Sequence, residues 1–192
     1  SDKLFIAANN IIGSKEKSFA VVRYGNVMGS RGSVIPLFLQ KAKQGKIPIT
    51  DKNMTRFNIT LKEGVETVLW SINNTLGGEI IVPKIPSYRI IDIANAIGPN
   101  CKHEIIGIRQ GEKLHEEMIT ASDSYTTIDL GKYFAILPSD GALRKIYENK
   151  KIKFTEYPKN LSYNSGENKD FLSITDIKKL IKENIDENFL LI

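Results

Sequence analysis

RYGNVMGSRGSVIPLF, residues 23–38, is the stretch that decides the fold of this chain. It follows a continuous apolar run, Phe19–Val22, and passes through a glycine-rich turn into an apolar helix. The three glycines of the turn let the backbone approach a ligand closely, and the first turn of a helix offers free N–H groups to an anion; they are Gly25, Gly29 and Gly32. The stretch therefore predicts a buried strand, an anion-binding turn and a helix in sequence.

Outward from this stretch, expected strands alternate with expected helices, which favours an α/β fold. The further strands are expected at 47–49, 79–82, 103–108 and 132–137. Helices are expected at 34–45, after a capping box of Thr60 with Glu63, at 90–97, at 114–119 and after a cap at Ser173. Apolar residues recur at helical spacing in two of them: Val65, Val68, Leu69 and Ile72 in one, and Ile174, Ile177 and Ile181 on the inner face of the last.

Composition limits the function classes. The chain has 192 residues, 41% of them hydrophobic, which suits one domain or a domain and a half. Its single cysteine, Cys101, excludes an internal disulfide and fits a reducing cytoplasm. The net charge of +5 comes from scattered lysines without a recognition motif, so we expect no nucleic-acid partner. A modest basic excess also suits an anionic small substrate. No apolar run is long enough for a membrane span.

Asn26, Arg31 and Ser33 stand in the turn after the first strand, and ligands of open α/β sheets bind at such strand ends. The Asn26 amide can donate to a phosphate or sugar oxygen, and the planar Arg31 guanidinium suits phosphate. The alternatives are an asparagine that only stabilises the turn and an ordinary surface arginine. Spacing alone leaves both pairs of alternatives open.

Arg56 lies in ITDKNMTRF, residues 49–57, beside the apolar Met54 and Phe57. An arginine in such surroundings needs an anionic partner or a route to solvent. The partner is either a protein carboxylate or a ligand phosphate.

A third arginine-bearing turn is RQGEKLHEE, residues 109–117. Arg109 can hold a pyrophosphate while Glu112 accepts from two vicinal ribose hydroxyls. The alternative is an ordinary charged turn followed by a helix. Three such turns in one α/β chain favour an anionic ligand.

Other chemical signals are absent or are set aside. The sequence has no GxGxxG and no P-loop. His103 and His115 are too far apart for a metal site and are interpreted as structural or exposed. Tyr147 and Lys151 match Tyr-x-x-x-Lys, but in a lysine-rich segment we interpret this match as chance.

Four segments together resemble the nucleotide-sugar 4,6-dehydratases of the extended short-chain dehydrogenase/reductase superfamily. In order they are RYGNVMGSRGSVIPLF, ITDKNMTRF, GGEIIVPKIPS and IIGIRQGEKLHEEM, with an echo in FLSITD at 171–176. Within this superfamily they look like the C-terminal part of the inverting UDP-N-acetylglucosamine 4,6-dehydratases of pseudaminic acid biosynthesis. The fold implied is the C-terminal part of a Rossmann-type protein with its substrate-binding subdomain.

The resemblance also implies roles for individual residues. Tyr24 and Val27 would lie beside the nicotinamide of NADP, and Asn26 would contact the substrate phosphate or sugar. Arg31 and Ser33 would line the substrate loop, and Thr50 and Met54 would border the uridine. Arg56 and Arg109 would hold the pyrophosphate region, and Glu112 the ribose. Gln110 replaces the proline usual at its place in the family.

Enzymes of this family oxidise C4 of the sugar with NADP, eliminate water across C5–C6 and return the hydride to C6. Their glycine-rich phosphate loop, Asp/Lys acid–base pair and Tyr-x-x-x-Lys motif are not found in this sequence, so no catalytic residue is assigned. The segment Ser1–Asn10 reads as the end of a helix without a start, and we expect these motifs upstream of Ser1. The chain alone is therefore expected to be inactive.

The resemblance divides the chain into a dinucleotide-binding remnant at 1–33, a mostly UDP-sugar-binding region at 34–138 and a tail at 139–192. It implies UDP-N-acetylglucosamine as the substrate, a homo-oligomer, and a cytoplasmic lyase that serves flagellin or surface glycans. Two alternatives stay open: a stand-alone UDP-sugar-binding module without catalysis, and a retaining or 5-epimerising relative.

Overall fold

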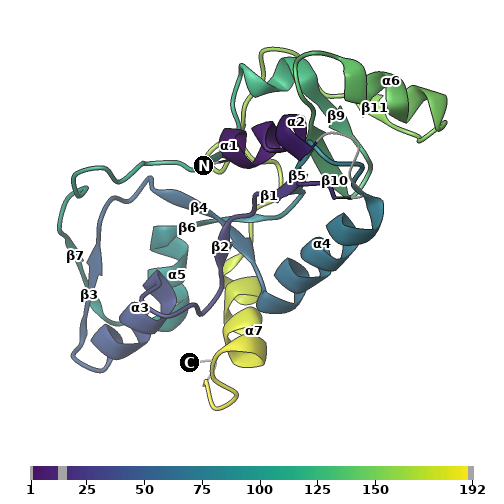
Figure 1. The fold of residues 1–192 in the computed structure, drawn as a ribbon. Coiled ribbons are helices and arrows are strands. Elements are labelled where there is room, and N and C mark those ends of the chain that lie inside the picture. The colour runs from purple at the N-terminus through teal and green to yellow at the C-terminus, as the bar shows by residue number, and fades with distance from the viewer. Residues whose placement is uncertain (1, 13–16, 190–192) are drawn as a thin grey trace. The chain divides into compact units, whose positions relative to one another are not determined.

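The computed structural model describes residues 2–12 and 17–189 of the chain (Figure 1). These residues form two compact units, each assembled from three segments of the sequence. Unit 1 consists of Ser1–Tyr24, Lys62–Lys84 and Glu117–Tyr163, and unit 2 of Gly25–Leu61, Ile85–Glu116 and Asn164–Ile192. Both contain helices and strands, so the predicted α/β class is confirmed.

Unit 1 is built on a mixed sheet in the order β1-β5-β10-β9-β11. β1 runs parallel to β5, and the other neighbours are antiparallel. The strands of this sheet are β1 (Val21–Val22), β5 (Ile80–Pro83), β9 (Thr127–Asp129), β10 (Tyr133–Ile136) and β11 (Thr155–Glu156). The further elements are α1 (Asp2–Ala7), α2 (Asn9–Ile12), α4 (Leu61–Asn74), β8 (Glu117–Ile119), the 3₁₀ helix η1 (Asp123–Thr126), α6 (Ala142–Asn149) and β12 (Tyr163–Asn164).

The core of unit 1 lies between this sheet and helix α6. Ile81 and Ala135 are opposite each other in the register and are fully buried. Leu143 and Tyr147 of α6 pack on the same cluster, because they are four residues apart and share one helix face. β1 is shorter than expected. Phe19 lies before it and is 37% exposed, so the predicted strand buried on both faces is wrong for that residue.

Helix α4 exposes its apolar residues instead of burying them. Val65, Val68, Leu69 and Ile72 are 49, 39, 55 and 71% exposed, whereas Gly64, Thr67 and Ser71 are buried. The two hydroxyls can be buried because each donates to a backbone carbonyl one turn earlier, Thr67 to Glu63 and Ser71 to Thr67, both at 2.7 Å. The periodicity therefore located the helix, but its apolar stripe is not its buried face.

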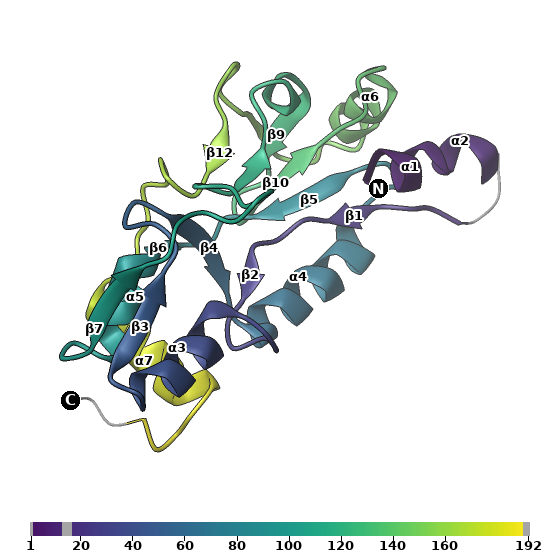
Figure 2. The same ribbon diagram turned by 90° about the vertical axis from the view of Figure 1, so that its left-hand side faces the viewer.

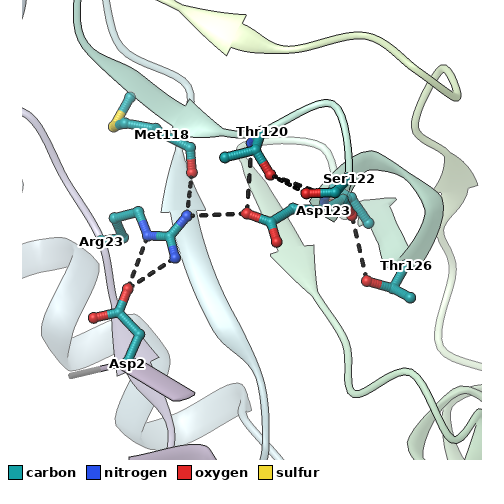
Figure 3. A network of polar contacts seen from close by, with 8 residues as sticks. Asp2, Arg23, Met118, Thr120, Ser122, Asp123 and Thr126 are labelled. Carbon is teal, nitrogen blue, oxygen red and sulfur yellow. Dashed lines mark hydrogen bonds and ion pairs between the residues drawn. The ribbon is translucent and has the colours of Figure 1, made fainter.

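Arg23, which follows β1, connects α1, β8 and η1 of unit 1 (Figure 3). Its Nε and Nη2 donate to Asp2 of α1 at 3.0 and 2.8 Å. Its Nη1 donates to the Met118 carbonyl at 2.6 Å and lies 3.5 Å from Asp123 of η1. The Arg23 guanidinium thus donates to structural partners within unit 1. Its position directly before the glycine turn did not indicate this structural role.

In its described residues, unit 2 contains two small sheets and three helices. One sheet has the order β2-β4-β6, from β2 (Asn26–Val27), β4 (Thr55–Ile59) and β6 (Ser87–Arg89), and the other pairs β3 (Lys46–Ile49) with β7 (Lys102–Ile105) in parallel. The helices are α3 (Val34–Ala42), α5 (Ile90–Ile97) and α7 (Ile174–Asn184). In Figures 1 and 2, α3 lies beside β3, and α5 lies beside α7.

The core of unit 2 brings together helices that are far apart in the sequence, α5 and α7. Ile93 of α5 and Ile177 and Ile181 of α7 are fully buried in one cluster. The predicted cap of α7 is confirmed, because Ser173 and Asp176 form a reciprocal capping box. Ile174 was expected on the inner face of α7 but is 39% exposed, at the first position of the helix, where the packed face has not yet begun.

The helix expected at 114–119 is not formed, and this prediction is wrong. Residues 117–119 are strand β8. The carbonyls of Leu114 and Glu116 accept from Thr55 N at 3.1 Å and Ser165 N at 2.8 Å instead of from residues one turn later. Long-range backbone bonds have replaced the local helical ones.

The compact units are interleaved in the sequence, whereas the division expected at residues 33 and 138 was consecutive. The expected division was made by which ligand each region binds, and the compact units do not test that, so it stays a prediction. Ser1, the first residue of the expected helix end, lies outside the described residues; Asp2–Ala7 and Asn9–Ile12 are helical. Among residues 2–12 and 17–189, no helix has both the length and the apolar character needed to cross a bilayer.

Candidate functional site

One face of the three-stranded sheet in unit 2 gathers polar side chains. In the β2–β4 register Asn26 is opposite Asn58, and in the β4–β6 register Arg56 is opposite Tyr88. Residues two apart on a strand share a face, and so do residues directly opposite on neighbouring strands. Asn26, Asn58, Arg56 and Tyr88 therefore lie on one face, which we call the polar face.

Arg56 is the buried cation of this face, with an exposure of 8%. Its Nη1 donates to the carbonyls of Thr55 at 2.7 Å and Leu114 at 3.2 Å. Its Nη2 lies 3.6 Å from Glu112 Oε1, and its Nε lies 3.6 Å from Glu116 Oε1. The sequence left two alternatives for the anionic partner of Arg56, a protein carboxylate or a ligand phosphate. The structure shows that protein carboxylates are partners. Both carboxylates stand beyond hydrogen-bond distance, so Nε and Nη2 keep donor capacity for a ligand.

Glu116 stands over the polar face from the loop that precedes β8. The orientation of the Asn26 amide is assigned from its partners: with its nitrogen toward Glu116, it donates to Oε1 at 2.8 Å and to Oε2 at 3.2 Å. Phe57 N also donates to Oε2, at 3.4 Å. Burial raises the pKa of Glu116 above its ordinary value, and the Arg56 charge opposes that rise. The pKa of Tyr88 is raised as well, by burial and by the Glu116 charge.

Arg109–Glu112 form a closed turn beside this face. Glu112 N donates to the Arg109 carbonyl at 3.0 Å, and Gly111 at the third position has φ +81°. A positive φ at that position is the signature of a type II turn, which favours proline at its second position. Gln110 occupies the second position, and the turn closes without proline. The Glu112 carboxylate accepts from Arg109 N at 3.3 Å, which fixes its direction within the turn.

In unit 2, two buried oxygens find no hydrogen-bond partner among the residues that the structure describes: Asn58 Oδ1 and Ser33 Oγ. Asn58 is 2% exposed and belongs to the polar face. Ser33 is the N-cap residue of α3, with extended backbone, but its side chain makes no capping bond. Buried polar atoms are normally satisfied, so each of these oxygens is free to accept a hydrogen bond from a ligand or a water molecule.

The remaining sequence-predicted residues are more scattered. Arg31 is exposed in the turn before α3, and Thr50 is half-buried after β3. Met54 is 1% exposed and belongs to the apolar core of unit 2, so its side chain faces away from solvent. Within the described part of the chain, none of these three makes a hydrogen bond or ion pair with Asn26, Arg56, Arg109 or Glu112.

The two residues expected near a nicotinamide fall in different units. Val27 is half-buried in β2 of unit 2, and Tyr24 is the last residue of unit 1, with an exposure of 41%. The structure therefore groups Asn26 and Arg56 around Glu116, and Arg56 also contacts Glu112 in the turn that begins at Arg109. The two expected cofactor contacts stay predictions.

Glu116, Asn58 and Tyr88 were missed by the sequence analysis. Asn58 had a signal, because it lies two residues after Arg56 on the same strand and thus shares its face. Glu116 was assigned to a helix start, and only the long-range bonds of its loop bring it to the polar face. Tyr88 carried no signal, since its pairing with Arg56 depends on the register of two strands.

The residues set aside in the sequence have structural roles. His115 Nδ1 lies 2.8 Å from Thr55 Oγ1, within the framework of unit 2. Tyr147 is 2% exposed and donates to the buried Glu79 at 2.9 Å, which leaves its hydroxyl engaged away from any ligand. Over the described ranges there is no cluster of three or more histidine, cysteine or acidic residues that could hold a metal ion.

Unit 1 has a cavity of about 720 Å³ between α1, the Gly77–Gly78 turn and α6. No residue with a sequence-predicted ligand role lines it. The cavity thus lies in unit 1, whereas the buried Arg56 charge and the unsatisfied Asn58 Oδ1 lie on the polar face of unit 2. The lining of the unit 1 cavity includes the carboxylates of Asp123 and Asp140, which disfavour an anion, so we place the anionic ligand at the polar face of unit 2.

Comparisons with known proteins match the motifs. The model of the family described as polysaccharide biosynthesis protein matches residues 1–138. A UDP-N-acetylglucosamine 4,6-dehydratase (inverting) of Campylobacter jejuni serotype O:2 is 56% identical over 141 residues, which are 72% of this chain and 42% of the relative. The resemblance inferred from the four segments is thus confirmed.

A UDP-glucose 4-epimerase of Rickettsia akari is 38% identical over 190 residues, covering 94% of this chain and 54% of the relative. The X-ray structure of Pen from Bacillus thuringiensis superimposes with a TM-score of 0.79 at 31% identity, covering 95% of this chain and 54% of Pen. The chain spans about half the length of the curated relatives it matches.

Proposed function

This chain belongs to the polysaccharide biosynthesis protein family, and from that premise we propose that it carries the UDP-sugar-binding site of an inverting UDP-N-acetylglucosamine 4,6-dehydratase. Its identity of 56% to a relative of that name supports the choice of substrate class. The catalytic activity proposed is that of the whole enzyme, a lyase.

The observation that carries the proposal is the buried Arg56, with Asn26 on the same face and two carboxylates at 3.6 Å. In this account Arg56 and Arg109 hold the diphosphate, and Glu112 accepts from the ribose hydroxyls. Asn26 donates to a phosphate or sugar oxygen.

The lining of the site is proposed from the resemblance. Arg31 and Ser33 line the substrate loop, and the free Ser33 Oγ supports a polar contact there. Thr50 and Met54 border the uridine. Because the Met54 side chain is in the core, its contribution is to hold the neighbouring backbone in place.

NADP is proposed as the cofactor of the whole enzyme, with Tyr24 and Val27 beside the nicotinamide. The residues of this chain do not make up a dinucleotide site, because the sequence has no glycine-rich phosphate loop. No step is therefore derived through the cofactor, and the chain by itself is proposed to be inactive.

The wider setting of the proposal is pseudaminic acid synthesis for flagellin or surface glycans, in a cytoplasmic homo-oligomer. The resemblance supports it, and the free Cys101 fits a reducing compartment.

A second candidate function is sugar-nucleotide binding for a 4-epimerase. It is favoured by the Rickettsia relative, whose match extends over 94% of the chain. The two candidates share the nucleotide-binding chemistry and differ in the sugar.

Isothermal titration with UDP-N-acetylglucosamine, UDP-glucose and UDP tests the proposal. We expect tightest binding of UDP-N-acetylglucosamine and no turnover by the chain alone. Tighter binding of UDP-glucose would support the epimerase candidate, and no heat with any of the three would reject both.

A further inference from the structure

The segment beyond the family-matched region, residues 139–192, returns to the site through Ser165. Ser165 is fully buried. Its N–H donates to the Glu116 carbonyl at 2.8 Å, and its Oγ accepts from Glu116 N at 2.9 Å. One residue of the tail therefore binds both backbone polar groups of Glu116.

The same hydroxyl is tied to strand β4. Thr55 Oγ1 lies 2.7 Å from Ser165 Oγ and 2.8 Å from His115 Nδ1. Next to it, a Cβ on Gly166 would stand 2.7 Å from the His115 ring, so only glycine fits there without a shift. The contact between the tail and the 115–116 loop is thus closely packed as well as hydrogen-bonded.

From its fixed backbone, the Glu116 carboxylate reaches two strands. It accepts from the Asn26 amide at 2.8 and 3.2 Å and lies 3.6 Å from Arg56 Nε. Asn26 and Arg56 are the groups that the proposed function directs at the diphosphate. Among the residues that the structure describes, no other side chain contacts both Asn26 and Arg56.

We propose that Ser165 and Glu116 are positioning residues, with Ser165 fixing the Glu116 backbone and the Glu116 carboxylate orienting Asn26 and Arg56 toward the diphosphate of a UDP sugar. This inference rests on the proposed function, because it needs a nucleotide at the polar face. It gives the tail a role in ligand binding. It also separates the roles of two glutamates: Glu116 orients protein side chains, whereas Glu112 accepts from the ribose.

The charges around Glu116 are consistent with this role. Arg56 faces it from β4, Tyr88 from β6 and Lys113 from its own loop, and Asn26 faces it from β2. The Glu116 carboxylate accepts from the Asn26 amide and pairs electrostatically with the Arg56 guanidinium, so one charged group acts on both.

UDP titration of the whole chain and its variants tests the inference. Ser165→Ala removes the hydroxyl, and we expect UDP affinity to fall about fivefold, the usual effect of one hydrogen bond. Ser124→Ala is the matched control. Ser124 is also buried, and its Oγ likewise accepts from a backbone N–H, that of Asn160 at 2.8 Å, but it lies in unit 1. This control should lose stability and keep its UDP affinity.

Glu116→Ala and Glu116→Gln provide a second test in the same titration, which holds even if Ser165→Ala fails to fold. The alanine variant should bind UDP about tenfold more weakly, because it loses bonds to a charged group. The glutamine variant should stay within about threefold of the wild type or bind more tightly, because its amide oxygen still accepts from Asn26.

The side-chain amide signal of Asn26 in a ¹⁵N–¹H spectrum provides a readout that stability alone does not move. It should shift in Ser165→Ala and Glu116→Ala and stay in place in Ser124→Ala. Unchanged affinity and an unchanged Asn26 signal in Glu116→Ala would overturn the positioning role while the wild type still binds UDP. Failure of the wild type to bind UDP would instead reject the proposed function.

Discussion

Arg56 Nη2 lies 3.6 Å from Glu112 Oε1, so the buried arginine of β4 pairs with the acidic residue of the 109–112 turn. Both residues were assigned to a ligand from the sequence, one to its diphosphate and the other to its ribose. Their mutual contact means that the site holds its cation in place through its own carboxylates. A ligand diphosphate then meets an arginine whose orientation is already set.

Arg56→Met should lower the free energy of unfolding by about 1–3 kcal/mol, because it leaves two half-buried carboxylates without their cation. Urea unfolding followed by circular dichroism measures this. Arg109→Ala, at an exposed residue, is the control and should change stability by less than about 0.5 kcal/mol. An equal loss in both variants would mean that the Arg56 pairs are no stronger than surface pairs.

Glu116→Gln should change how stability depends on pH. The pKa of Glu116 is raised in the folded state, so between its ordinary value near 4.5 and the raised value the folded protein binds more protons than the unfolded chain. The contribution of Glu116 to stability therefore falls as the pH rises through that window. The variant should gain most over the wild type at pH 7, and the gain should shrink toward pH 4.5. A gain that grows on acidification would show that the pKa is lowered instead.

Gln110→Pro should stabilise the protein by about 0.4–1 kcal/mol, because proline suits the second position of a type II turn and restricts the unfolded chain. Gly111→Ala should have the opposite effect, since φ is +81° at that residue. Thermal unfolding of both variants tests the turn type. Destabilisation by proline would rule out the type II geometry.

Gly166→Ala should cost about 1–3 kcal/mol, the usual penalty for overpacking, because its Cβ would meet the His115 ring at 2.7 Å. Gly64→Ala is the matched control. A Cβ there meets nothing within 4 Å, and Gly64 lies inside helix α4, so alanine should stabilise by about 0.5–1 kcal/mol. Equal stability of the two variants in urea would contradict the packing between the tail and His115.

The sequence predicted the fold best where local signals act alone. The capping box at Ser173 and Asp176 fixed the start of α7, because both partners lie within one turn. The apolar spacing on α4 located the helix but misled about its buried face, since Thr67 and Ser71 satisfy their hydroxyls internally.

Long-range pairing explains what the sequence did not show. The 114–119 segment has helical composition, yet bonds from Thr55 and Ser165 hold it extended. Glu116 and Tyr88 join the site only through such pairings. Asn26, Arg56 and Glu112 were singled out because each stands in a short motif, but their motifs left alternatives open and their ligand roles came from the resemblance.

Titration of the chain with UDP-N-acetylglucosamine, in parallel with Arg56→Met and Arg144→Met, tests the central claim most directly. Arg144 pairs with Glu156 in unit 1, at 2.6 Å, and is the matched arginine away from the polar face. We predict one-to-one binding that weakens about tenfold or more in Arg56→Met, the loss expected for a charged hydrogen bond, and is unchanged in Arg144→Met. Binding that is unaffected by Arg56→Met would contradict the assignment of the UDP-sugar site to the polar face.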